Sequence, residues 1–465
     1  MSKTAAAPST GAATLKRSLG LIALVGLGLG YMTPTVVFDT FGYIAVDTNN
    51  VVPAAYLAGL IVLMFTAVSY GKMATAMPDA GSAYTYVQRS IHPNFGFMVG
   101  WAALLDYLLL PMVNAIIVRG YLESIFPDVP GWIWVVIYVV VTTAIIYLTM
   151  RGTSNVNMML LIFASVVMLV FVVVVIGQLL QGAGDGTVLS VKPFFNETTD
   201  MTVLFAGAAL VAFSFIGFDA VTMYAEEAKD SKMVPRAILG TVIAGGVIFL
   251  IASYFTQLRF PSFDVFPQEA IDNTTLPEIG SQVGGNFMTI LLTAAGFAAT
   301  VASGLASHSS VSRMMLVMGR NNVLPRRAFG YINPKTQTPT FSILVAGAVS
   351  LLAIWFDLDV IFNLISFGAL IAFTFVNISV IVWFGIRQGR RHTFRDIISY
   401  WVMPIIGTGL TVILWVNLQA DTLRQGAIWF GIGLVYLLFV SRGLTRRVQA
   451  FDENQPVTGF TKAVD

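Results

Sequence analysis

Three carboxylates stand inside long apolar segments of this 465-residue chain, at Asp39, Asp106 and Asp219. A charged side chain at the centre of a bilayer costs about 2.5–3.5 kcal/mol, so each acid needs a partner or a function. A buried carboxylate can bind a cation, and it can also take up a proton when no cation is near. These acids are therefore the first candidates for a site that handles cations or protons.

The amino-acid composition indicates the class of protein that contains these acids. The chain is 56% hydrophobic and 11% charged, with no cysteine and three scattered histidines, whereas soluble domains carry about 25% charged residues. This excludes a water-soluble enzyme, a nucleic-acid binder and a disordered regulator, and the absence of cysteine excludes disulfides and thiol chemistry. We expect an all-α polytopic protein embedded in a lipid bilayer, with no catalytic residues, no metal and no cofactor.

The hydropathy pattern predicts twelve membrane-spanning helices, since about 20 apolar residues cross a bilayer. Their expected bounds are 18–46, 51–77, 95–125, 131–150, 155–180, 201–227, 234–260, 286–318, 339–357, 360–387, 398–418 and 424–442. The expected organisation is an N-terminal tail (1–17), spans 1–5 (18–180), an outer loop (181–200), spans 6–10 (201–387), spans 11–12 (388–442) and a C-terminal tail (443–465).

Basic residues orient these spans. With the N-terminus inside, the cytoplasmic side holds 22 of the 26 Lys and Arg, and the outer side keeps Arg119, Lys192, Arg259 and Arg424. This bias predicts that both termini are cytoplasmic. The outer connections are correspondingly acidic, either because acids accumulate where bases are excluded or because they form a funnel that concentrates cations.

Two spans are interrupted in the middle, at 26–35 (GLGLGYMTPT) and at 213–219 (FSFIGFD). Glycine and proline weaken a helix, and unwound backbone at membrane depth is tolerated only where it lines a cavity or is packed in protein. Interruptions five helices apart fit a five-plus-five inverted repeat whose site lies at the two breaks.

Three motifs resemble the amino acid–polyamine–organocation transporter superfamily over about residues 16–445. They are SYGKMATAMPDAGSAYTY (69–86), EEAKDSKMVPRAI (226–238), and SRMMLVMGRNNVLP (312–325) continuing to PKTQTP (334–339). Segments 31–42, 96–107, 213–221 and 305–313 resemble bacterial putrescine importers more closely. The resemblance implies the LeuT-type fold, a bacterial cytoplasmic membrane, and uptake of a diamine coupled to the proton gradient.

Two departures from the wider superfamily bear on the substrate and the coupling ion. Amino acid permeases hold the substrate carboxylate with a Gly-Ser/Ala-Gly stretch in span 1, but here residues 32–35 (MTPT) include a proline without an amide. A substrate that lacks a carboxylate would not need that stretch. Some proton-coupled members have a lysine in span 5, and residues 155–181 contain none, so another group must carry the proton.

Asp219 matches the superfamily position where polyamine carriers place an acid, so the resemblance assigns it to a substrate ammonium; capping of the second half of span 6 is the alternative. Asp39 and Asp106 are candidates for the second ammonium of a diamine, or else they pair with polar neighbours. The full predicted substrate site is Tyr31, Thr33, Thr35, Asp39, Asp106, Tyr107, Phe215, Phe218 and Asp219.

The expected function is therefore import of putrescine or a related polyamine by alternating access, with H⁺ as the coupling ion. The alternatives are a diamine/amino-acid exchanger, a cationic amino acid permease, or a membrane sensor that does not transport. Cadaverine and agmatine stay open as substrates, as do the proton-carrying residue and the oligomeric state.

Overall fold

The computed structural model describes residues 19–78, 81–148, 153–197, 199–321, 323–333, 336 and 338–443. Within these ranges, side chains 153–156, 226, 227 and 359 are not described. The described chain is helical, and its β-type pairing is limited to one isolated bridge between Leu19 and Ala228. The expectation of an all-α protein is confirmed, and the tail segments 1–17 and 444–465 lie outside the described residues.

The helices and their bounds are α1 (Leu21–Met32), α2 (Val36–Asp39), α3 (Phe41–Asp47), α4 (Val52–Ala76), α5 (Ser82–Ser90), α6 (Pro93–Ile125), α7 (Gly131–Leu148), α8 (Thr153–Leu180), α9 (Met201–Val211), η1 (Ala212–Phe215), η2 (Ala220–Glu227), α10 (Met233–Arg259), η3 (Phe263–Val265), α11 (Gln268–Asp272), α12 (Leu276–Arg320), α13 (Arg326–Phe329), α14 (Thr340–Ser350), η4 (Leu351–Ile354), α15 (Leu358–Val380), η5 (Ile381–Arg387), α16 (Phe394–Ile397), η6 (Ile398–Val402), α17 (Met403–Val416) and α18 (Ala420–Val440).

Among the described residues, eleven helical stretches are long and apolar enough to cross a membrane. The expected span at 339–357 corresponds to α14 and η4, an apolar helix of 11 and 4 residues. At 1.5 Å per residue it covers about 22 Å, less than the roughly 30 Å of a hydrocarbon core. The expected count of twelve spans stays a prediction.

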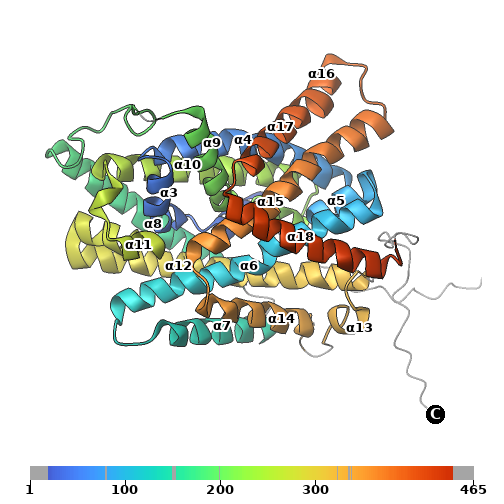
Figure 1. The fold of residues 1–465 in the computed structure, drawn as a ribbon, viewed down its shortest axis with the longest axis horizontal. Helices are drawn as coiled ribbons and strands as arrows, with labels where there is room; N and C mark the ends of the chain where they lie inside the picture. Colours follow the sequence, from blue (N-terminus) through green and yellow to red (C-terminus); the bar gives the residue numbers. More distant parts are fainter. Residues whose placement is uncertain are drawn as a thin grey trace, which may run out of the picture.

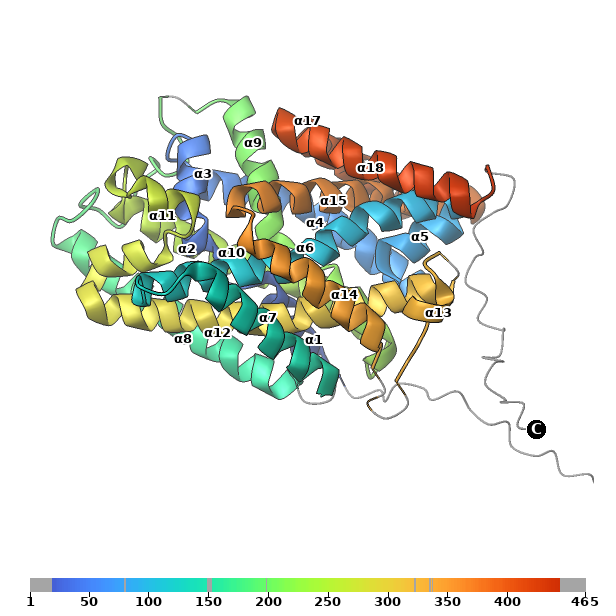
Figure 2. The same cartoon turned by 60° about the horizontal axis from the view of Figure 1, so that its bottom comes forward.

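The bundle has a central and a peripheral set of helices. Figures 1 and 2 show α6 and α12 running side by side through the molecule, and Figure 2 shows α17 and α18 along one edge. In α6, 89% of the apolar segment is buried, against 17% in α18. The buried helices therefore build the core, and the edge helices present apolar side chains outward, as a lipid environment requires.

Both predicted breaks are confirmed, and they touch one another. Helix α1 ends before Thr33, whose φ of 50° is left-handed, and the chain resumes as α2. Span 6 changes from α9 to η1, turns at 216–219, and continues as η2. Gly217, with φ of 133°, lies so close that a Cβ would be 2.9 Å from Met32 Cγ and 3.0 Å from the Gly28 carbonyl oxygen. Only glycine permits this contact.

The start of span 8 differs from the prediction. Helix α12 begins at Leu276 and kinks at Gly284 and Gly285, whose backbone is not helical, so the expected start at 286 marks the kink. The preceding turn is fastened to α2, because the Thr275 N–H donates to the Asp39 carbonyl at 3.1 Å. The connection between spans 7 and 8 thus packs onto the second half of span 1.

The connection after span 2 contains a helix, α5, that sequence analysis did not identify. Gly96 and Gly100 of α6 allow it to approach closely, since a Cβ at Gly96 would be 2.6 Å from the Gln88 Cα and one at Gly100 would be 2.7 Å from the Tyr84 ring. Every residue of α5 except Arg89 is buried. The segment is therefore part of the core and not a surface loop.

A pair of tryptophans joins span 12 to span 3. The rings of Trp101 and Trp429 stack with centroids 4.8 Å apart. Each indole N–H donates to the other residue's carbonyl, at 3.0 Å from Trp101 and 2.9 Å from Trp429. Gly433 lies against the Trp101 ring and leaves room for it. This reciprocal contact fixes α18 to α6.

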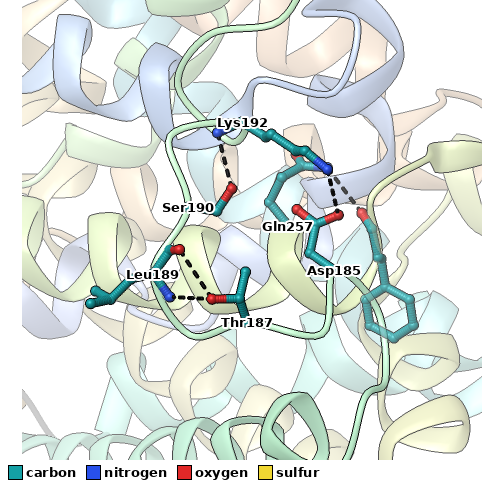
Figure 3. Close-up of polar contacts among 7 residues, drawn as sticks. Asp185, Thr187, Leu189, Ser190, Lys192 and Gln257 are labelled. Atoms are coloured by element: carbon teal, nitrogen blue, oxygen red, sulfur yellow. Dashed lines mark hydrogen bonds and ion pairs between the residues drawn. The ribbon is translucent and has the colours of Figure 1, made fainter.

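Within the connection expected to be an outer loop, residues 185–192 make several short-range polar contacts (Figure 3). Lys192 lies 3.7 Å from a carboxylate oxygen of Asp185, and the Thr187 hydroxyl bonds both backbone groups of Leu189. Arg119 and Arg424 likewise lie near Glu123 and Asp421, at 3.9 and 3.6 Å. Three of the four bases that the sequence places on the outer side thus lie near acids, and the surplus of carboxylates expected on that side stays a prediction.

Candidate functional site

Asp106, Tyr107 and Asp219 line one cavity, although they come from different spans. Tyr70 of α4, the start of α5 and side chains of α6, α12 and α15 complete the wall; the lining residues are Tyr70, Gly81, Ser82, Ala83, Tyr84, Ala103, Asp106, Tyr107, Asp219, Met314 and Ala372. The three predicted residues are each no more than 2% exposed. The cavity is therefore surrounded by protein, and in this conformation it has no room for a water molecule, so its walls must move apart to admit a ligand.

The break in span 6 holds Asp219 in place. Its Oδ2 accepts a hydrogen bond of 2.7 Å from the Tyr107 hydroxyl, and its Oδ1 accepts one of 3.2 Å from the Gly217 N–H. Asp219 stands directly before η2, but its side chain makes no capping hydrogen bond to that helix. The carboxylate is thus held by two donors, the Gly217 N–H in the turn and the Tyr107 hydroxyl of α6.

Asp106 is held differently from Asp219. It lies in α6 where α15 approaches closely, because a Cβ at Gly368 would be 2.6 Å from the Ala102 carbonyl oxygen and 3.2 Å from the Asp106 nitrogen. Its Oδ1 is buried and has no hydrogen-bond partner among the described residues. A buried acceptor without a partner costs free energy, so this atom is suited to receive a donor from a ligand.

The electrostatics of the cavity favour a cation. Two carboxyl groups face it, and no Lys, Arg or His occurs among the described residues that line it. Buried charges are stable only when they are paired. A bound ammonium would supply the missing positive charge and several N–H donors at once.

Hydroxyl groups without well-aligned hydrogen bonds surround the same space. The Tyr70 and Ser82 hydroxyls, both in the cavity wall, lie close enough to interact with each other, but neither makes a well-aligned hydrogen bond to a described residue. The hydroxyl of Tyr31 also makes no such bond, and it lies close enough to Asp106 and Asp219 to interact electrostatically with both. The wall therefore offers neutral oxygens as well as carboxylates.

Asp39 belongs to a different polar group. Its Oδ1 accepts hydrogen bonds from the Tyr121 hydroxyl at 2.5 Å and from the Thr274 hydroxyl at 2.8 Å, while its Oδ2 has no partner among described residues. Asp39 does not line the cavity that holds the other two acids. Its contacts match the alternative of packing against polar neighbours, at the junction of α2, α6 and the start of α12.

The other predicted residues lie around the cavity and not in its wall. Thr33 and Thr35 are buried on either side of Pro34. Phe215 packs against Phe249, with ring centroids 5.4 Å apart, and so faces spans 2 and 7. Phe218 packs against Tyr70 at 5.6 Å and forms a second layer behind the wall.

Sequence reasoning missed the contribution of α5 and of Tyr70. The stretch 69–86 served only as a family motif, although it contains a turn-forming Pro78, the small residues Gly81 and Ser82, and several tyrosines. Small residues next to aromatics after a span are a weak signal for a segment that folds back into the protein. The structure shows that Tyr70 and residues 81–84 of this segment belong to the wall of the cavity.

Comparison with known proteins gives a consistent result. The pattern of the family described as amino acid permease matches residues 24–444. The low-affinity putrescine importer PlaP of Escherichia coli strain K12 is 41% identical over 447 residues, which cover 96% of this chain and 98% of that protein.

More distant relatives are also permeases. The branched-chain amino acid permease BcaP of Bacillus subtilis strain 168 is 26% identical, covering 94% of this chain and 95% of its own length. The chloroplastic cationic amino acid transporter 7 of Arabidopsis thaliana is 29% identical over a match that covers 79% of this chain and 65% of that protein. The resemblance drawn from the sequence motifs is confirmed: this multi-pass membrane protein belongs to the amino acid permease family.

Proposed function

We propose that this chain imports putrescine, or a diamine of similar length, across a bacterial cytoplasmic membrane by alternating access, and that it is a transporter and not an enzyme. The observation that carries the proposal is the pair of carboxylates, Asp106 and Asp219, in one enclosed cavity whose described wall contains no base. The 41% identity to a putrescine importer supports the same substrate class.

The break in span 1 supports an amine without a carboxylate. Pro34 has no amide to donate, and the residue before it is the left-handed Thr33. The wall of the cavity contains two carboxyl groups, which accept hydrogen bonds from an ammonium and, when ionised, repel a carboxylate. This pattern of acceptors argues against a neutral amino acid as the substrate.

Proton coupling is the second part of the proposal. Symport requires the proton and the substrate to be bound at the same time, so the proton needs a group that the ammonium does not occupy. Asp39 meets this condition, because it lies outside the cavity and its buried Oδ2 has no partner among the described residues. We assign the coupling proton to Asp39.

Uptake by proteoliposomes tests the transport proposal. Wild type should accumulate radiolabelled putrescine under an inward proton gradient without internal amine, and Asp219→Asn should not. The matched control is Asp421→Asn, which removes an exposed outer carboxylate. Uptake only into liposomes preloaded with an amine or amino acid would identify an exchanger. Stronger competition by arginine than by putrescine would identify a cationic amino acid permease. Binding without uptake would identify a sensor.

A further inference from the structure

Ser82 has an unusual backbone for its residue type. It is the first residue of α5 and adopts φ of 47°, in the left-handed region that disfavours residues with a Cβ. Such a conformation costs about 1–3 kcal/mol and persists only where the surroundings enforce it, commonly at functional sites. Ser82 is 2% exposed, so the strain is located inside the protein.

The surroundings of α5 explain how the strain is maintained. The Tyr84 ring rests against Gly100 of α6. The Tyr84 hydroxyl accepts hydrogen bonds from Gln88 Nε2 at 3.1 Å and from Asn321 Nδ2, at the end of α12, at 3.4 Å. These contacts fix α5 between two long helices, and the strained residue at its start is held facing the cavity.

The chemistry of a primary ammonium gives the Ser82 hydroxyl a role. A –NH₃⁺ group has three N–H donors and no acceptor. Asp106 and Asp219 can accept two of these hydrogen bonds, and a third acceptor is needed to avoid a buried donor without a partner. Ser82 Oγ lines the same cavity, is buried, and lies beside the Tyr70 hydroxyl without forming a well-aligned hydrogen bond to it or to another described residue. A hydroxyl oxygen has two lone pairs, so this contact leaves room for a further donor.

We propose that Ser82 Oγ accepts the third hydrogen bond of the substrate's primary ammonium, so that the site selects primary amines over N-methylated ones. The inference rests on the proposed function, because it assumes that the cavity holds an amine. It adds a specificity-determining residue that carries no charge.

Two substitutions separate the hydroxyl from the backbone. Ser82→Ala removes the hydroxyl and keeps the strained conformation, whereas Ser82→Gly removes both. If the hydroxyl binds the ammonium, both variants should raise the Kd for putrescine about ten-fold, the effect of losing one hydrogen bond to a charged group. Binding to purified protein in nanodiscs measures the Kd, and size-exclusion profile and Tm verify the fold. Wild-type affinity in either variant would overturn the inference.

A methylated substrate provides the second readout. In N,N,N′,N′-tetramethyl-1,4-diaminobutane each ammonium has one N–H, which a carboxylate can take. Wild type should bind it more weakly than putrescine, and Ser82→Ala should bind it as wild type does. An equal loss for both ligands would mean a general defect and would overturn the inference.

The two proposals fail in different ways. If wild type binds putrescine, Asp219→Asn abolishes binding and both Ser82 variants bind normally, the function stands and the role of Ser82 is wrong. If wild type does not bind putrescine, the function and the role of Ser82 are both wrong.

Discussion

At the residue scale, the two acids of the cavity differ in how many hydrogen bonds they already receive. Asp219 accepts two, from Tyr107 and Gly217, whereas Asp106 Oδ1 accepts none from the described residues. The first carboxyl is already held in place by donors, and the second has an oxygen that still requires a donor. A hydrogen bond from a ligand to Asp106 should therefore contribute strongly to the binding free energy, although this residue lies in the middle of an apolar helix.

Asp106→Asn tests this difference. The amide keeps the shape but removes the charge and presents N–H donors toward the ammonium, so putrescine affinity should fall by at least 100-fold, since a buried charge pair that loses one partner costs several kcal/mol. Both gradient-driven uptake and counterflow should be lost. An unchanged Kd for putrescine would place the ammonium elsewhere.

Asp39→Asn should give a different result. The amide oxygen can still accept from Tyr121 and Thr274, so the junction with the start of α12 is retained. The residue can no longer carry a proton. We expect loss of proton-driven accumulation with normal putrescine counterflow, measured in the same proteoliposomes. Loss of counterflow would show that Asp39 acts in binding or structure and not in coupling.

At the element scale, the breaks of spans 1 and 6 form one unit, because Gly217 lies so close to Gly28 and Met32 that a Cβ would clash with both. A side chain at Gly217 would push the two breaks apart, and with them Asp219. Movement of one break must therefore displace the other. The geometry of the site depends on this contact as much as on the acids.

Gly217→Ala should abolish putrescine binding and lower Tm by several degrees, because it combines about 1–3 kcal/mol of backbone strain with a clash against span 1. The matched control is Gly409→Ala in α17, where a Cβ would meet no atom within 4 Å. That variant should keep binding, with unchanged or higher Tm. Equal behaviour of the two variants would contradict the direct contact between the breaks.

The sequence predicted the elements better than the wall of the site. Glycine and proline mark the breaks, and a charge within an apolar run marks Asp106 and Asp219, because both signals are local. The burial of α5 depends on glycines of α6, which are distant in sequence. Phe215 and Phe218 flank the break as expected, but their rings follow the 3₁₀ geometry of η1 and the adjoining turn, and point to neighbouring helices.

At the scale of the whole molecule, the asymmetric distribution of bases predicts the orientation in the membrane, and the absence of cysteine makes it measurable. Leu189→Cys, in the outer loop, should react with a membrane-impermeant maleimide on intact cells. His392→Cys, between η5 and α16, should react only after the membrane is permeabilised. The chain without an introduced cysteine is the control and should take up no label. Labelling of His392→Cys but not of Leu189→Cys on intact cells would mean that the topology is the reverse of the one proposed.

The stacked pair of Trp101 and Trp429 has a spectroscopic consequence. Two indoles held 4.8 Å apart by reciprocal hydrogen bonds form a chiral chromophore whose excited states couple, which gives a paired signal in circular dichroism. Because each ring belongs to a different span, the signal reports on whether α18 travels with α6. A couplet that persists when substrate is added would identify these two helices as a rigid frame, against which the moving parts could be followed without any attached dye.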